Sequence, residues 1–362
     1  MVGLVIGLLA TLVVMQVFSI FEAQKRTTTG TADAQTNGNV ALFSIKRDVA
    51  MAGYGLIPIG QASVPDSPIE CTTTNYADSG VTTLDPVTIT DGGTAPGASD
   101  TITIRYSSSD TGGNFTQIKY IGTAGPNIAT VNDNQGCNVN DVALVVNGNT
   151  CNLTKVTALS TPPDYTLITL SNTASMGAAT GNQLACLGKW QEIVYRVNPN
   201  YNPVDPNNSQ AYLEQNGKPV VADIVNLQAQ YGITATVDSN QIIQWVDATN
   251  GPFGNFGPGM AVADRNRIKA IRVAVVARNN LMEKTYVSGP CTSLTADAPA
   301  GVCAWAGSSA GTNPISAAPA IDLSNDQDPT DPNLPQRWRR YRYRVFETMI
   351  PLRNMIWSKD TL

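Results

Sequence analysis

The sequence contains no histidine among its 362 residues. Without histidine there is no Ser-His-Asp or Cys-His nucleophile, no histidine general base and no zinc site with a histidine ligand. A Walker-type phosphate loop and a GxGxxG motif between a strand and a helix are also missing. No pair of Asp or Glu residues stands out as a general acid and base. We therefore expect a protein that is not an enzyme and that has no resident cofactor.

Charged residues are scarce as well, at 14% of the chain, while Thr, Asn, Ser and Gly are frequent. Such a composition is typical of short strands joined by polar turns in a protein exported from the cytoplasm. The net charge is −5, which argues against a surface that generally binds nucleic acid.

The first stretch, Met1 to Phe21, has no charged residue at all. It is long enough to span a bilayer as a helix. The motif Gly3-x-x-x-Gly7 would let a neighbouring helix approach closely, because glycine carries no side chain. We expect membrane anchoring or helix packing along this stretch, by the residues Gly3, Gly7, Ala10, Val14, Phe18 and Phe21.

An amphipathic stretch follows, in which apolar residues recur at a spacing of three or four. They are Leu42, Ile45, Val49 and Ala52, and we expect this face to be buried beneath a sheet of the head. Residues 1–53 are thus predicted to form one helix of roughly 75 Å, with an apolar half (1–21) and an amphipathic half (22–53). Gly30 and Gly38 are expected to weaken it locally, and Gly53 and Gly55 to end it.

The remaining residues, 54–362, are expected to form a β-rich, exported globular head, which makes the fold class α+β. Alternating apolar and polar residues predict strands at 101–106 and 192–197 and a half-buried strand at 268–276. A hairpin is expected where 141–146 and 151–156 flank Asn147-Gly148. The spacing of apolar residues in 220–231 predicts an amphipathic helix, and 56–93 is expected to be irregular.

The six cysteines are Cys71, Cys137, Cys151, Cys186, Cys291 and Cys303. Their even number in an exported chain indicates disulfides, and no CxxC pair suggests a metal cluster. Fifteen pairings are possible. Because short loops close at the lowest entropic cost, we favour Cys291–Cys303 and Cys137–Cys151, which leaves Cys71–Cys186.

An acidic loop near the C-terminus offers hard oxygen ligands at Asp322, Asp326, Asp328 and Asp331. Calcium binds such oxygens, but the Gly and the terminal Glu of an EF-hand are missing. The alternative is a solvated loop broken by proline, and calcium is the weaker interpretation.

Five arginines interleaved with aromatic residues follow in 337–346. As a strand, this segment would place Arg340, Arg342 and Arg344 on one face and Tyr341, Tyr343 and Val345 on the other. Arginines beside aromatic rings suit single-stranded nucleic acid. We favour a structural role, in which one face packs in the core and the arginines pair with the acidic loop.

The N-terminal sequences MVGLVIGLLATLVVMQVF, QKRTTTGTADAQTNG and RDVAMAGYGL resemble the N-terminal helix of type IV pilins, most closely the PilW-type minor pilins. The C-terminal RYRYRVFETMIPLRNMIW resembles the same family. Members are made with a basic leader, and their mature chains begin with a methylated aromatic residue followed shortly by a glutamate. Since neither feature precedes Met1, we expect about six mature residues and a basic leader upstream of it.

The resemblance implies a minor pilin that primes pilus assembly at or near the tip, with roles in twitching motility, adhesion or DNA uptake. The implied partners are other major and minor pilins, a tip adhesin and the assembly platform. The implied locations are the inner membrane, with the head in the periplasm, and the extracellular pilus. Two alternatives remain: a pseudopilin of a type II secretion system, and a plain membrane-anchored exported binding protein.

Overall fold

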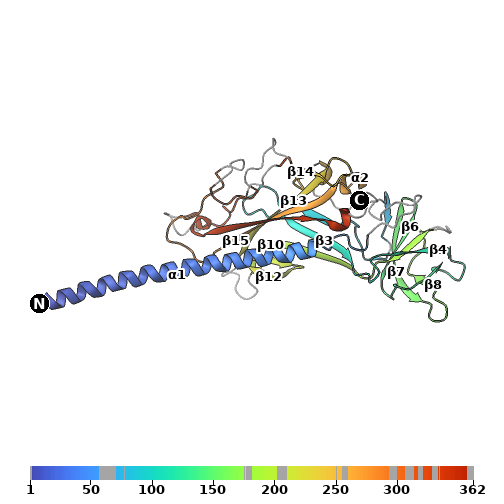
Figure 1. The fold of residues 1–362 in the computed structure, drawn as a ribbon, viewed down its shortest axis with the longest axis horizontal. Helices are drawn as coiled ribbons and strands as arrows, with labels where there is room; N and C mark the ends of the chain where they lie inside the picture. Colours follow the sequence, from blue (N-terminus) through green and yellow to red (C-terminus); the bar gives the residue numbers. More distant parts are fainter. Residues whose placement is uncertain are drawn as a thin grey trace.

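The computed structural model describes residues 2–56, 71–76, 78–174, 176, 182–201, 210–249, 251–254, 260–292, 300–305, 314–316, 321–327, 333 and 335–356. Its longest element is helix α1, Val2–Val49, which carries the N-terminus far from the rest of the molecule (Figure 1). Its 48 residues correspond to roughly 72 Å at 1.5 Å per residue. The expected long helix is therefore present, and it ends at Val49 rather than at residue 53.

Helix α1 continues without a break through its threonine- and glycine-rich middle. Thr28, Thr29 and Thr31 each donate a hydroxyl hydrogen bond to the carbonyl oxygen four residues earlier, at 2.8–3.0 Å. These hydroxyls are thus satisfied inside the helix instead of competing for its backbone. After the helix, Gly53 adopts a φ of +74°, as a glycine at a helix end commonly does, and its N–H donates to the Arg105 carbonyl at 2.9 Å.

The first sheet of the head has five antiparallel strands in the order β12-β11-β10-β3-β2. They are β2 (Val87–Thr90), β3 (Thr101–Ser107), β10 (Trp190–Tyr201), β11 (Gln210–Gln215) and β12 (Lys218–Ala222). The two strands expected near 101–106 and 192–197 are confirmed as neighbours, β3 and β10. The expectation of an irregular chain over 56–93 is wrong, because β2 and the short β1 (Thr73–Asn75) lie within it.

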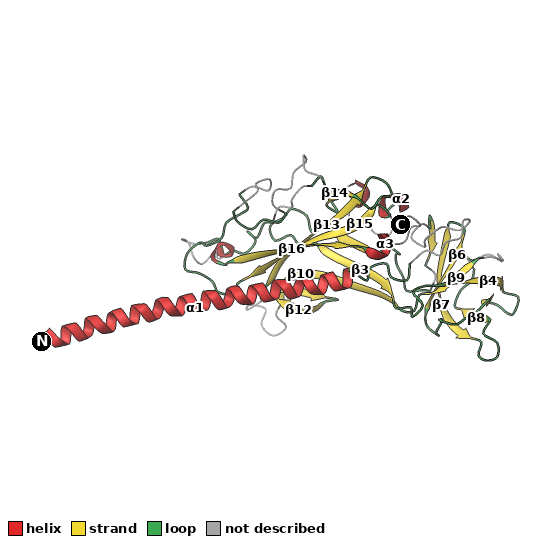
Figure 2. Ribbon diagram, in the orientation of Figure 1, coloured by secondary structure: helices red, strands yellow, loops and turns green. Residues whose placement is uncertain are grey.

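The second sheet has four strands in the order β14-β13-β15-β16, and α1 packs against it (Figure 2). The strands are β13 (Ile224–Thr234), β14 (Ile242–Val246), β15 (Ile268–Arg278) and β16 (Tyr343–Pro351). Four short helical elements accompany them: η3 (Gly251–Phe253), α2 (Val262–Arg265), η4 (Arg337–Arg340) and α3 (Arg353–Ile356). Strand β15 was expected to be half-buried, but residues on both of its faces are buried because it is central in this sheet.

The predicted helix at 220–231 is wrong, since this segment contains the end of β12 and most of β13. The apolar side chains of β13 alternate with polar ones, and both sets are buried. The main apolar core contains Leu227, Ala229 and Tyr231, and the buried polar residues between them are Gln228 and Gln230. A corner at Asp223, whose φ is +59°, turns the chain from the first sheet into the second. Both faces of β13 are buried, so its polar residues mark no water-facing side, and the helical spacing of its apolar residues is coincidental.

Six further strands close into a small barrel at the end of the molecule away from the N-terminus (Figure 1). They are β4 (Phe115–Ile121), β5 (Ile128–Val131), β6 (Val142–Asn147), β7 (Thr150–Leu159), β8 (Leu167–Leu170) and β9 (Gln183–Cys186). Pairings run from β7 through β6, β9, β4, β5 and β8 back to β7, and β1 adds to β7 from outside. The expected hairpin is confirmed as β6–β7, with Gly148-Asn149 as its turn. The closed barrel itself was not expected.

The disulfides correct two of the three expected pairings. The structure joins Cys71 to Cys151, Cys137 to Cys186 and Cys291 to Cys303. The expected pairs Cys137–Cys151 and Cys71–Cys186 are therefore wrong.

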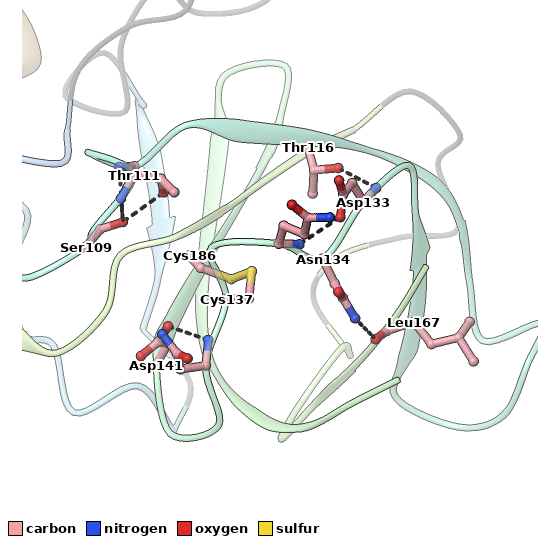
Figure 3. Close-up of a disulfide and its surroundings, with 12 residues drawn as sticks. Ser109, Thr111, Thr116, Asp133, Asn134, Cys137, Asp141, Leu167 and Cys186 are labelled. Atoms are coloured by element: carbon pink, nitrogen blue, oxygen red, sulfur yellow. Dashed lines mark hydrogen bonds between the residues drawn. A yellow bond between two sulfur atoms is a disulfide. The ribbon is translucent and has the colours of Figure 1, made fainter. Parts of the chain in front are cut away.

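The barrel wall explains the corrected pairings. Cys186 belongs to the core inside the barrel, where Cys137 lies beside it (Figure 3), whereas Cys151 faces outward into the main core. Parallel pairing of β1 with β7 then brings Cys71 to Cys151. A disulfide is too short to join a cysteine on the inner face of the barrel wall to one on its outer face, so Cys151 cannot pair with Cys137.

A buried carboxylate, Asp100, joins the start of β3 to β13. Its two oxygens accept backbone hydrogen bonds from Gly92 (3.0 Å) and Ala229 (2.7 Å). Burial raises the pKa of Asp100 to about 7, against the opposing effect of these two bonds, and the nearby charges of Asp91 and Asp247 raise it further. The folded protein therefore keeps a proton on Asp100 at pH values where the unfolded chain has lost it.

We expect the stability contributed by Asp100 to be fully present below about pH 4 and to be lost as the pH rises to about 7, by up to about 1.4 kcal/mol per pH unit. Asp100→Asn should flatten this slope in thermal melts recorded between these pH values. The control Asp110→Asn removes a charge from an exposed turn and should leave the slope as it is. Identical slopes in the wild type and Asp100→Asn would contradict the assignment.

Candidate assembly interface

The N-terminal part of α1 projects away from the head and exposes its apolar side chains (Figure 1). Phe18 is 72% exposed, Phe21 65% and Val14 53%. Gly3, Gly7 and Ala10 are exposed as well, and no heavy atom lies within 4 Å of a Cβ built on either glycine. The helix is long and apolar enough to cross a membrane. An apolar surface of this kind is unfavourable in water and is suited to burial in a bilayer or against other helices.

Farther along, α1 approaches the second sheet through two glycines. A Cβ built on Gly30 would lie 2.1 Å from Oδ1 of Asn279, and one built on Gly38 would lie 2.2 Å from the ring of Phe346. Both glycines were expected only to weaken the helix. The structure gives them a second role, since the missing side chains let the backbone of α1 come close to Asn279, which follows β15, and to Phe346 within β16.

Beyond Gly38 the helix is built into the main core. Ile45, Val49 and Ala52 are fully buried, and Leu42 is partly buried against the same core. These are the four residues whose spacing predicted a packed face. Ala34 and Ala41 extend this face toward the N-terminus. Small residues thus lie where the helix first meets the sheet, and larger ones follow where it enters the core.

A polar contact at Asp48 fixes the end of α1. Its carboxylate is buried and accepts hydrogen bonds from the Tyr195 hydroxyl (2.7 Å), Gln215 Nε2 (2.8 Å) and Arg47 Nε (2.8 Å). Burial and the bond to Asp48 raise the pKa of Tyr195 above its usual value, so the phenol stays protonated and remains a donor. Sequence analysis missed Asp48. Its carboxylate lies on the same side of the helix as Ile45 and Val49, and a charged residue on an apolar face is a signal for a buried polar contact.

The C-terminal part of the chain closes on the same place. Asn354 in α3 donates a hydrogen bond from Nδ2 to the Ala52 carbonyl at 2.9 Å. Ile350 and Leu352 of the adjoining segment are buried in the main core with the helix. The two segments that resemble the pilin family therefore meet in space.

The face of α1 opposite the head is not purely polar. Phe43 is 67% exposed, Val40 46% and the following Met51 41%. Sequence analysis assigned this face to water and missed these residues, although their spacing is visible in the sequence. Exposed apolar side chains therefore occur on α1 at the level of the head as well, after a polar stretch between Phe21 and Val40.

The arginine-rich segment is not one strand, as it was expected to be. Residues 337–340 form η4, and β16 begins only at Tyr343. Arg340 Nε donates to the Glu283 carbonyl (2.9 Å), Arg342 pairs with the Glu283 carboxylate (3.0 Å), and Arg344 is exposed. The expected ladder of Arg340, Arg342 and Arg344 therefore does not form.

The acidic loop pairs with arginine at one position. Asp326 forms ion pairs with Arg337 and, at 3.8 Å, with Arg278, while Asp322 accepts the N–H of Ser324. The other two calcium candidates, Asp328 and Asp331, lie outside the described residues. Among those that are described, no group of three or more Asp, Glu, Cys or His side chains is placed to hold a metal ion.

One comparison with known proteins gives a match. Residues 204–354 match the family model of the Type IV Pilus-assembly protein W. No curated protein and no solved structure matches the chain. The matched part runs from the end of the first sheet through β16 into α3 and contains neither α1 nor the barrel. The matched part includes most of the C-terminal segment that resembles the family but not the N-terminal helix, and it supports a PilW-type pilus protein.

Proposed function

We propose that the chain is a minor pilin, a non-enzymatic subunit that primes assembly of a type IV pilus at or near its tip. The observation that carries the proposal is the division of α1, which is exposed and apolar in its first half and built into the head in its second. A bilayer covers the first half before assembly, and the helices of other pilins cover it afterwards. Transfer of this half from the bilayer to the filament exchanges one apolar environment for another, so its free energy is close to zero.

The position of the barrel supports a place near the tip. The barrel extends beyond the C-terminal end of α1, on the side away from the apolar half (Figure 1). In a filament whose helices run along the axis, this is where subunits added earlier would lie. The barrel would collide least with neighbours in a subunit at the tip, because no earlier subunit lies beyond it. Motility, adhesion or DNA uptake would follow from the filament that the chain helps to start.

The proposed partners are other major and minor pilins, a tip adhesin and the assembly platform. The proposed locations are the inner membrane, with the head in the periplasm, and the extracellular pilus. A pseudopilin would share α1 and the head, and a plain anchor would need only the membrane-spanning half. Deletion of the gene separates the first alternative, because loss of pili with normal protein secretion favours the pilin.

The test of the proposal is the double substitution Gly3→Leu with Gly7→Leu. Leucine at both positions keeps the helix apolar but holds neighbouring backbones apart. We expect the variant to insert into the membrane normally, to be recovered poorly in sheared surface filaments and to reduce piliation. The control Val13→Leu with Val17→Leu introduces the same two leucines at positions that already carry bulky side chains, so it hardly changes how closely a neighbouring helix can approach. Normal recovery and piliation of the glycine variant would favour a plain tether.

A further inference from the structure

Strand β16 is the last strand of its sheet, and within the described part of the chain it pairs only with β15. The N–H of Asn279 donates to the Arg342 carbonyl, and the N–H of Leu352 donates to the Lys269 carbonyl, both at 2.8 Å. Because backbone direction alternates along an antiparallel pair, even-numbered residues between these points face β15. The N–H and C=O groups of Tyr343, Val345, Glu347 and Met349 therefore point outward.

Among the residues that the structure describes, the chain covers this edge only at its start. The N–H of Val287 donates to the Arg339 carbonyl (2.8 Å), and the Ser288 hydroxyl donates to the Tyr341 carbonyl (2.6 Å). From Tyr343 onward, no backbone hydrogen bond reaches the outer edge from any residue that the structure describes. An outward-facing ladder of this length is a template for another strand.

A groove of about 850 Å³ lies beside the first residues of this open edge. One wall is β16 at Tyr343, Arg344 and Val345, and the other includes Pro290 and Cys303 at the base of the Cys291–Cys303 loop. Backbone groups in such a groove are satisfied best by an extended peptide, which offers its own donors and acceptors at the same spacing.

The charge of the groove narrows the choice of occupant. Arg339 and Arg344 line it, and its described lining contains no Asp or Glu. Arg344 is exposed. Farther along, Met349 is 58% exposed and offers an apolar contact on the outer face, whereas Glu347 is engaged by the Trp305 N–H. Arginines without acidic neighbours in the groove favour a segment with Asp or Glu side chains.

We propose that the free edge of β16 binds an extended, acidic segment of another pilus subunit, which adds to the sheet as a further strand. The inference rests on the proposed function, because it takes the partner to be part of the same filament. It assigns the contact to the head, independently of the helix packing of α1.

Met349→Pro tests this contact. Proline removes the outward N–H of Met349 but none of the bonds to β15, and edge strands accept proline at such positions. The control Met349→Ala keeps the N–H, and Thr348→Pro removes an inward N–H as a folding control. We expect Met349→Pro to melt near the wild type, unlike Thr348→Pro. Its recovery in sheared filaments should fall roughly tenfold, as the loss of a hydrogen bond that leaves its partner unsatisfied implies.

Photo-cross-linking supplies a second measurement that does not depend on the proline variant. With Val345→benzoylphenylalanine, we expect a cross-link to an acidic segment of another filament subunit. The same probe at Tyr120, exposed on the barrel, should not give this product. Wild-type recovery of Met349→Pro, or a cross-link confined to the chain itself, would overturn the inference. Absence of the wild-type chain from sheared filaments would instead refute the proposed function.

Discussion

Ile45→Asp is expected to lower the stability of the head by about 4 kcal/mol, because it places an unpaired charge in the core. Ile45 is fully buried beneath the second sheet. The only carboxylate one turn away, Asp48, is already bonded to Tyr195 and Gln215 and would repel the new charge. Thermal melting of the detergent-solubilised full chain, followed by tryptophan fluorescence, measures the effect.

Phe43→Asp is the matched control for this variant. It introduces the same side chain two residues earlier, on the opposite and exposed face of α1. We expect its melting temperature to equal that of the wild type. Equal melting of Ile45→Asp and Phe43→Asp would mean that the head is stable without the helix, contrary to the packing seen here.

The long helix and five of the strands could be predicted because their signals are local. An apolar run, a spacing of three or four and the glycines at its end define α1, and simple alternation defines β3, β10 and the β6–β7 hairpin. Alternation also located β15, although both of its faces are buried and not one. In β13 the polar residues between the apolar ones are buried too, so they did not mark a water-facing side. The helix expected at 220–231 failed for this reason.

The barrel and two disulfides could not be predicted, since they depend on pairings between distant segments. Closure of the barrel requires β7 to pair with β8 and β4 with β9, and no local pattern encodes either contact. The preference for Cys137–Cys151 rested on a separation of 14 residues (151 − 137), against 49 for the observed pair. This difference amounts to only about 1 kcal/mol of loop entropy, which the barrel geometry outweighs.

The candidate interface was visible in part. The stripe from Gly3 to Phe21 and the face from Leu42 to Ala52 follow from the sequence, because both are periodic. Asp48, Val40 and Phe43 do not belong to the set of apolar residues that defines this face, so sequence analysis left them out. The role of Gly38 depends on a ring more than 300 residues away in the chain, Phe346.

Gly38→Leu is expected to destabilise the head by about 2–3 kcal/mol, which is the cost of overpacking a fitted contact. Helix propensity alone predicts the opposite, since leucine is better than glycine inside a helix by roughly 0.5–1 kcal/mol. The structure decides the sign, because a Cβ on Gly38 would lie 2.2 Å from the Phe346 ring. Thermal melting of the full chain in detergent measures it.

Gly7→Leu in the same helix is the matched control, since no heavy atom lies within 4 Å of a Cβ there. We expect it to melt like the wild type, even though it should hinder assembly together with Gly3→Leu. Phe346→Ala opens the space that the introduced leucine side chain would need, so the double variant with Gly38→Leu should recover part of the loss, as a coupled pair does in a double-mutant cycle. Stabilisation by Gly38→Leu alone would show that α1 does not approach β16 this closely, and additive losses in the double variant would place the strain elsewhere.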